Sequence, residues 1–287
     1  MEIEYFDTPP RLGTRYAAAL LPGKGRGDTL PERPLTLTDH RVDAAALADY
    51  ARVCGFGVDG YLPVTYPQVL SFALQVRLMS SSDFPLRLPG LVHLRQRMSQ
   101  HRSVAADEPL HVTVHAERFR PHPRGAQVDL VTDVAVAGEP VWTGRSTYLA
   151  RGAKAPDPDT GGADPSEPPV ITGPHPDARW RLPSDLGRRY ARVSGDVNPI
   201  HLHPLAAKAF GFPGAIAHGM WTVARCVAAL QGRLPASHTV DAVFRKPLVL
   251  PATVELLTRA HPDGWTQTLR SDPDRVHLVA AVTGEGS

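Results

Sequence analysis

The sequence is poor in cysteine and in long hydrophobic stretches. Its 287 residues include only two cysteines, Cys54 and Cys226, which are too few for a disulfide framework and are typical of a reducing compartment. No hydrophobic run approaches the length of a membrane span. The N-terminal residues, Met1-Glu2-Ile3-Glu4, lack the basic and hydrophobic regions of a signal peptide. We therefore expect a cytoplasmic protein without a membrane span.

Charge and short motifs exclude further classes of protein. The formal net charge is +2, which gives no reason to expect a nucleic-acid partner. No spacing of histidine and cysteine is typical of a zinc site. The glycine-rich run Gly23–Gly27 neither follows a strand pattern nor precedes a helix pattern, which argues against a phosphate-binding loop. Ser194 lies outside any nucleophile-elbow pattern, so a hydrolase that forms an acyl-enzyme has little support.

One segment divides the chain. Residues 153–169 are rich in proline, glycine and aspartate and lack hydrophobic periodicity, which is typical of a linker or a mobile loop. At 287 residues the chain also exceeds the usual size of a single domain. We therefore predict an N-terminal domain over 1–152 and a C-terminal domain over 170–287.

The two predicted domains share a sequence pattern. Tyr50–Phe56 aligns with Tyr190–Asp196 at an offset of 140 residues, and Leu62-Pro63 aligns with Phe212-Pro213 at an offset of 150. A change of offset is expected when loops contain insertions. The pattern indicates a degenerate duplication of one structural unit.

Hydrophobic patterns predict a similar order of elements in both domains. The first domain is expected to contain helices at 43–53 and 67–78. Alternation of hydrophobic and polar residues predicts strands at 111–119, 127–136, 141–150, 240–244, 253–259, 264–270 and 275–282. A long helix followed by several strands, twice over, predicts an α+β chain.

The stretch 190–222 concentrates acidic, amide and imidazole side chains between short helices. A helix is predicted over 185–192, with Ser184 as its N-cap and Gly195 at its end. Asn198-Pro199 is typical of a second helix start, because Asn suits the N-cap and Pro suits the first helical position.

This pattern places an acid close to an imidazole. Asp196 is expected in the turn between the two helices and His201 just inside the second one, so the pair could hold a small ligand such as water. A third helix is predicted to begin near Ala217, and the start of this helix, Ala217-His218-Gly219, would offer free backbone N–H groups. Because Gly219 has no side chain, an oxygen with developing negative charge could approach its amide closely. The combination suggests proton transfer next to a carbonyl.

Two linked motifs in this stretch resemble those of a known family. The run Tyr190–His201 resembles the signature of the (R)-specific enoyl-CoA hydratases among the MaoC-like dehydratases, and Phe212–Met220 matches that family's continuation into its central helix. The resemblance implies the hotdog fold, in which an antiparallel sheet wraps a long central helix. With the duplication it implies a double hotdog.

The resemblance also implies a reaction and its residues. The reaction is the reversible syn addition of water to a trans-2-enoyl thioester, which gives a (3R)-hydroxyacyl thioester in fatty-acid metabolism. On the matching positions, Asp196 and His201 would form the catalytic dyad, Asn198 would orient it, and the Gly219 amide would be the oxyanion donor. His218 lies beside that amide, and both a structural role and a substrate contact are open to it. The resemblance implies no metal, nicotinamide or flavin. Coenzyme A or an acyl-carrier phosphopantetheine takes part only as a portion of the substrate.

The duplicated half is predicted to have lost this chemistry. Phe56 occupies the position of Asp196, Tyr61 occupies that of His201, and Gln68-Val69 stands opposite His218-Gly219. A benzyl group and a phenol cannot relay a proton at neutral pH as a carboxylate and an imidazole can. We expect one active site in each chain, with the first half as a scaffold and a wall of the acyl pocket.

Several other roles are predicted less directly. His203 is expected to pack or cap locally. Arg245 and Lys246 follow Phe244 near a strand end, where they are either solvated or in contact with the phosphates of coenzyme A or with an acidic acyl-carrier protein. Because a double hotdog already contains the usual paired unit, a monomer and a homodimer are both compatible with the sequence.

Two other functions stay open. A hotdog acyl-CoA thioesterase would need only Asp196 to direct water at the carbonyl carbon, and the paired His201 argues against it. A non-catalytic acyl-binding subunit would suit the first half alone, and the intact dyad of the second half argues against it. A third possibility keeps the hydratase chemistry but changes the substrate, for example to a short branched or dicarboxylic acyl-CoA.

Overall fold

The computed structural model describes residues 3–10, 12, 28–88, 90–155 and 165–284. Three features discussed above lie partly or wholly outside these ranges. They are the first two residues, the glycine-rich run Gly23–Gly27 and the central part of the predicted linker, 156–164.

Two compact units make up the structure, and each combines separate parts of the chain. The first unit comprises Met1–Val42, Pro67–Gln96 and Asp107–Ser166, and the second comprises Asp43–Tyr66, Arg97–Ala106 and Glu167–Ser287. Residues 43–66 and 97–106 of the predicted N-terminal domain therefore belong to the second unit. Residues 43–66 do so because helix α2 (Ala44–Cys54) packs against helices α4 (Leu186–Ser194) and α7 (Gly219–Ala228) of that unit.

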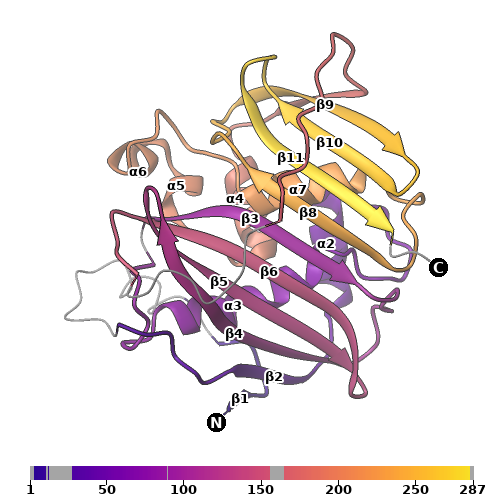
Figure 1. Cartoon of the computed structure of the whole chain (residues 1–287). Helices are drawn as coiled ribbons and strands as arrows, with labels where there is room; N and C mark the ends of the chain where they lie inside the picture. The colour runs from indigo at the N-terminus through magenta and orange to yellow at the C-terminus, as the bar shows by residue number, and fades with distance from the viewer. Residues whose placement is uncertain (1–2, 11, 13–27, 89, 156–164, 285–287) are drawn as a thin grey trace. The chain divides into compact units, whose positions relative to one another are not determined.

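The first unit consists of helix α3 (Tyr66–Met79) and a mainly antiparallel sheet (Figure 1). The strands follow the order β1-β2-β4-β5-β6-β3. The β1–β2 pair is parallel, whereas the β2–β4, β4–β5 and β5–β6 pairs are antiparallel. The strand bounds are β1 Glu4–Phe6, β2 Leu35–His40, β3 Leu91–Gln100, β4 Leu110–His122, β5 Gly125–Val136 and β6 Glu139–Arg151. The last four residues of β3, 97–100, are counted with the second unit.

Buried amides and hydroxyls fix α3 to this sheet. Gln75 Nε2 donates a hydrogen bond to Thr132 Oγ1 of β5 at 3.1 Å, and Gln68 Nε2 donates to Ser146 Oγ of β6 at 3.2 Å. Gln68 also donates to Gln75 Oε1 at 3.1 Å. All four side chains are buried. Because a buried polar group is costly unless it is hydrogen-bonded, this network specifies how the helix sits on the sheet.

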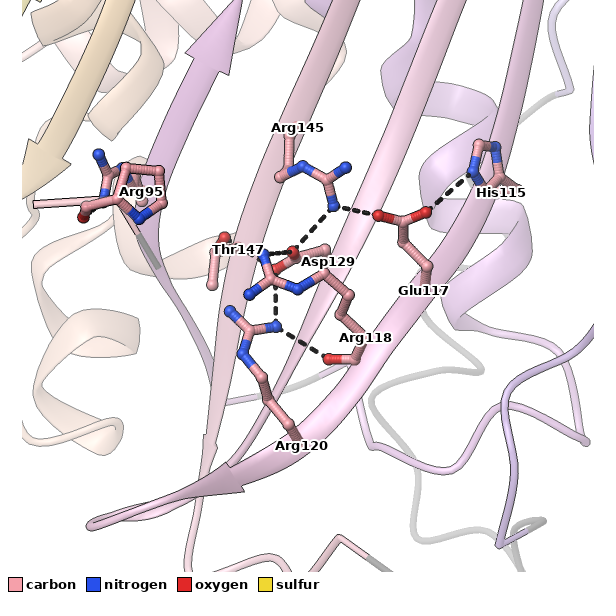
Figure 2. Close-up of polar contacts among 9 residues, drawn as sticks. Arg95, His115, Glu117, Arg118, Arg120, Asp129, Arg145 and Thr147 are labelled. Carbon is pink, nitrogen blue, oxygen red and sulfur yellow. Dashed lines mark hydrogen bonds and ion pairs between the residues drawn. The ribbon is translucent and has the colours of Figure 1, made fainter. Parts of the chain in front are cut away.

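A buried carboxylate organises a second polar network in the first unit (Figure 2). Asp129 of β5 is fully buried and accepts hydrogen bonds from four side chains on neighbouring strands. The donors are Arg118 Nη1 at 3.2 Å, Arg120 Nη1 at 3.3 Å, Arg145 Nη1 at 3.0 Å and Thr147 Oγ1 at 2.8 Å. Arg145 also pairs with Glu117 of β4. Removal of Asp129 would leave guanidinium groups in a poorly solvated place without their carboxylate.

The second unit repeats the plan of a helix and an antiparallel sheet. Its strands follow the order β8-β11-β10-β9-β7, and each neighbouring pair is antiparallel. The strand bounds are β7 Ala178–Leu182, β8 His238–Phe244, β9 Ala252–His261, β10 Gly264–Arg270 and β11 Val276–Gly284. Two short helices, α5 (Pro199–Leu202) and α6 (Pro204–Ala209), lie between α4 and α7 in the chain.

Helix α7 is the central helix of the second unit. Its side chains Trp221, Val223 and Val227 are buried, and Gln267 Nε2 of β10 donates a hydrogen bond to the Cys226 carbonyl oxygen at 2.9 Å. Each unit thus pairs a central helix with an antiparallel sheet. The predicted α+β double hotdog fold is confirmed.

The predicted helices and strands are present, with their ends shifted by a few residues. The prediction of Ser184 as an N-cap is wrong, because Asp185 is the N-cap of α4. Helix α7 begins at Gly219, two residues later than predicted. Strands β1, β2, β3 and β7 were not predicted. Strand β3, for example, has the amides Gln96 and Gln100 at buried positions, so its buried positions are not marked by hydrophobic residues alone.

Cys54 and Cys226 are both buried free thiols. Burial raises the pKa of each thiol to about 12, so both stay protonated at neutral pH.

Among the described residues, no helix is long and hydrophobic enough to cross a membrane.

Candidate active site

Asp196 is held at the end of α4 by local backbone geometry. Gly195 ends the helix in the left-handed region with φ 73°, as predicted, and its N–H donates to the Ala191 carbonyl oxygen. The Asp196 N–H donates to Ser194 Oγ at 3.2 Å, and the Asn198 N–H donates to Asp196 Oδ1 at 3.1 Å. The turn therefore fixes both the backbone and the carboxylate of Asp196.

Asn198 begins helix α5 as predicted. Its side-chain oxygen accepts a hydrogen bond from the Ile200 N–H at 3.4 Å, and Pro199 is the first helical residue. The side chain of Asn198 is thus a helix cap, and the contact of this residue with Asp196 is made by its backbone N–H.

His201 lies in α5 with one nitrogen committed to the backbone. His201 Nδ1 is 2.8 Å from the Ile216 carbonyl oxygen, which can only accept a hydrogen bond, so Nδ1 carries the proton. In the neutral ring Nε2 then has a free lone pair and can act as a base. Gly187 of α4 lies so close to α5 that a Cβ atom there would be 2.0 Å from the His201 carbonyl oxygen. Tight packing of α4 on α5 therefore sets the position of His201.

His218 and Gly219 form the start of α7. His218 is the N-cap residue, and its ring stacks on the His201 ring with centroids 3.7 Å apart. Gly219 is the first residue of the helix, where N–H groups have no partner in a preceding turn. A Cβ atom at Gly219 would be 2.8 Å from the Phe244 ring, so packing favours a glycine at this position. The predicted free N–H of Ala217 is wrong, because it donates to the Leu248 carbonyl oxygen at 2.8 Å.

Burial keeps both imidazoles neutral. Desolvation lowers the pKa of His201 from its ordinary value, against the opposing effect of the nearby Asp196 carboxylate. Burial and the neighbouring His201 lower the pKa of His218 to about 3. The side chains of Asp196, His201 and His218 are 24 %, 9 % and 3 % exposed, so solvent reaches the group mainly from the side of Asp196.

One oxygen or nitrogen atom from each of Asp196, His201 and His218 lies within 4.8 Å of the others. An ion bound to a histidine lies in the ring plane about 2 Å from the nitrogen. Two rings stacked 3.7 Å apart at 27° cannot both meet that condition for one ion. The arrangement suits proton transfer better than metal binding.

Comparison with known proteins identifies the family. The model of the MaoC like domain family matches residues 170–258, which contain Asp196, Asn198, His201, His218 and Gly219. The 3-hydroxyacyl-thioester dehydratase X of Mycobacterium tuberculosis is 39 % identical over 273 residues, or 94 % of this chain and 96 % of that protein. This chain belongs to the MaoC-like dehydratase family.

Solved structures of this family share the fold. The crystal structure of HtdX from Mycobacterium tuberculosis is similar with a TM-score of 0.78 and 37 % identity, over 88 % of this chain and 100 % of that one. A MaoC-like dehydratase from Phytophthora capsici has a TM-score of 0.73 over 90 % of this chain and 96 % of that one. At 18 % identity, the latter similarity concerns the fold alone.

The remaining predicted residues of this MaoC-like dehydratase lie as follows. His203 Nδ1 accepts a hydrogen bond from the Leu205 N–H at 3.2 Å and caps α6, as predicted. Arg245 pairs with Glu167, and Lys246 Nζ donates to the Asp274 carbonyl oxygen at 2.8 Å. Contacts of Arg245 and Lys246 with phosphate stay predictions, and a phosphate would compete with these partners.

Some residues of the site environment were not singled out from the sequence. The Tyr190 ring is 4.9 Å from the His218 ring, and the Tyr50 ring of α2 is 6.3 Å from Tyr190. Burial raises the pKa of both phenols well above the ordinary value, so neither is an acid at neutral pH. The sequence offered one signal for these two residues, because tyrosine stands at the same place in both copies of the repeat.

Proposed function

We propose that this protein is a hydro-lyase that reversibly dehydrates (3R)-hydroxyacyl thioesters to trans-2-enoyl thioesters in fatty-acid metabolism. The observation that carries the proposal is that Asp196 and His201 lie together beside His218, the N-cap of α7, with the tautomer of His201 fixed by the Ile216 carbonyl. The name of the mycobacterial relative, 3-hydroxyacyl-thioester dehydratase X, supports the same chemistry.

His201 is assigned as the base in dehydration. Its Nε2 lone pair accepts the α-proton of the thioester, while the Nδ1–H stays hydrogen-bonded to the Ile216 carbonyl. The lowered pKa of His201 keeps the ring neutral, and so ready to accept this proton, at neutral pH.

Asp196 is assigned as the acid that protonates the departing β-hydroxyl. The C–O bond breaks, water leaves, and the electron pair of the α-carbon forms the double bond. The dyad ends with the proton on His201, and hydration runs the same steps backwards, with Asp196 taking a proton from water. Because the two groups share one proton, the assignment belongs to the pair.

The Gly219 amide is assigned to the thioester oxygen. Removal of the α-proton places negative charge on this oxygen, and a positioned N–H donor is worth roughly 3 to 4 kcal/mol in such a transition state. The helix dipole of α7 adds to this stabilisation, because its positive end lies at Gly219.

The thioester carrier is coenzyme A or an acyl-carrier protein, and no further cofactor is needed for these proton transfers. Monomeric and homodimeric forms are both compatible with the proposal. A thioesterase of the same fold would use Asp196 without His201. The Asp196–His201 pair favours the dehydratase.

The proposal is tested by following the absorbance of the enoyl thioester after addition of the protein, with free thiol assayed in the same sample. We expect loss of absorbance without thiol release, and its abolition in both Asp196→Asn and His201→Ala. Release of thiol would identify a thioesterase instead. Full activity of either variant would remove that residue from the mechanism.

A further inference from the structure

His218 has no nitrogen available for the substrate. His218 Nε2 is 3.0 Å from the main-chain carbonyl oxygen of Asp196, which can only accept, so Nε2 carries the proton. His218 Nδ1 is then the unprotonated atom of the neutral ring. It is enclosed by protein and has no hydrogen-bond partner among the described residues. A substrate contact, one of the two roles open to His218 from the sequence, is therefore not favoured by the geometry.

The same ring touches both members of the dyad. Its face stacks on His201 with centroids 3.7 Å apart and an interplanar angle of 27°. Its Nε2–H holds the backbone of Asp196, and the same nitrogen is 3.8 Å from Asp196 Oδ2. The Tyr190 ring also contacts His218, at 4.9 Å and an angle of 54°, so the imidazole is held by two aromatic neighbours. His218 thus links two groups that lie on different turns of the chain.

We infer that His218 is a positioning residue, which sets the distance between the Asp196 carboxylate and the His201 ring. This inference rests on the proposed function, because it assigns His218 a role in the proton transfers of that dyad. Since efficient transfer needs the reacting atoms about 3 Å apart, a displacement of either group by about 1 Å lowers the rate by roughly 100-fold. The His218 ring stays neutral at working pH and does not compete for the shared proton.

The first half of the chain suggests the variant that separates the two contacts. Gln68 occupies the position that corresponds to His218, and its amide N–H donates to Ser146 Oγ. His218→Gln therefore retains an N–H donor without an imidazole ring. His218→Phe retains a stacking ring without a donor.

The matched control is His238→Phe. His238 is 3 % exposed, like His218, and its Nδ1 is 2.8 Å from the Pro235 carbonyl oxygen. It lies at the opposite end of β8 from Phe244, six residues and about 20 Å along the strand. This control measures the general cost of losing a buried imidazole.

The experiment measures kcat, KM and the pH profile of enoyl-CoA hydration, together with the melting temperature, for wild type and these variants. We expect His218→Phe to lower kcat by roughly 10- to 100-fold with KM changed less than about threefold. We expect His218→Gln to recover about tenfold of that loss, because the donor to Asp196 is restored. We also expect the basic limb of this hydration pH profile to move in His218→Gln, where the stacked ring is lost, because protonated His201 delivers the α-proton in that direction. His238→Phe should lower the melting temperature alone.

Three results would overturn the inference. A loss of melting temperature with unchanged kcat in both His218 variants would make the residue structural. A rise in KM with unchanged kcat would make it a substrate contact. Equal kcat losses in the Phe and Gln variants would show that the N–H donor to Asp196 does not position the dyad. If the His218→Phe protein does not fold, His218→Leu replaces it. An inactive wild type would instead contradict the proposed function, so the two failures are distinguishable.

Discussion

Replacement of Gly219 by proline removes one hydrogen-bond donor from the proposed oxyanion site. Gly219 is the first residue of α7, a position where proline is well tolerated because its fixed φ suits the helix. The preceding His218 has φ −66° and ψ 135°, which is the extended conformation that a residue before proline prefers. The substitution should therefore remove the N–H with little change to the backbone.

The matched control is Gly219→Ala. A Cβ atom at this position meets the Phe244 ring at 2.8 Å, so both variants displace that ring, but alanine keeps the N–H. The difference between the two variants thus isolates the donor. Loss of one oxyanion donor lowers kcat by about 100- to 1000-fold, or roughly 3 to 4 kcal/mol.

The assay is steady-state hydration of an enoyl-CoA, with thermal melting of each variant alongside. We expect kcat of Gly219→Pro to be about 100-fold below that of Gly219→Ala, at similar melting temperatures. Equal kcat values in two folded variants would show that the Gly219 amide does not stabilise the transition state.

Three further changes test other parts of the structure. Gly187→Ala places a Cβ atom 2.0 Å from the His201 carbonyl oxygen and should lower kcat by about 10- to 100-fold. In the control Gly57→Ala the nearest contact of the new Cβ atom is at 3.5 Å, so kcat should be unchanged. Asp129→Leu removes a fully buried carboxylate from its arginine partners and should lower the free energy of unfolding by about 3 to 5 kcal/mol in urea titrations. An unchanged urea midpoint would mean that the network adds no stability. Folding lowers the pKa of His218 to about 3, so the unfolded chain binds more protons than the folded one below about pH 6.5. Stability therefore falls as the pH falls, and His218 alone accounts for a loss of about 2 kcal/mol between neutral pH and pH 5. Urea titrations at pH 7 and pH 5 should show a smaller pH dependence in His218→Phe than in wild type, and an equal dependence would refute the assignment.

Local rules recovered much of the site from the sequence. Gly195 ends α4 in the left-handed region, and Asn198-Pro199 begins α5, so the turn that holds Asp196 could be predicted from neighbouring residues alone. His201 and Gly219 followed from the spacing of two motifs that resemble one family.

Contacts distant in the sequence could not be predicted in the same way. The Ile216 carbonyl, which fixes the tautomer of His201, is 15 residues further along the chain. The stacking of His218 on His201 and the donation of its Nε2–H to the Asp196 carbonyl depend on how α5 meets the start of α7. No periodicity or short motif encodes this meeting, because it is set by packing between elements.

The division into units also depended on packing. Helix α2 was predicted from its pattern, and in the structure it begins after the N-cap Asp43, whose Oδ1 accepts from the Ala45 and Ala46 N–H groups. Its assignment to the second unit follows from its contacts with α4 and α7, and the sequence pattern of a helix does not specify its neighbours. The break at 153–169 marked the start of the family match, which begins at residue 170, better than it marked the units.

The most direct test of the proposed chemistry uses water labelled with heavy oxygen. The protein is incubated with a trans-2-enoyl-CoA in the labelled water, and the products are identified by mass spectrometry. We predict one labelled oxygen on the β-carbon of an intact hydroxyacyl-CoA, formed by wild type and absent with Asp196→Asn. Label in the carboxylate of a free acid would contradict the account, because water would then have attacked the carbonyl carbon.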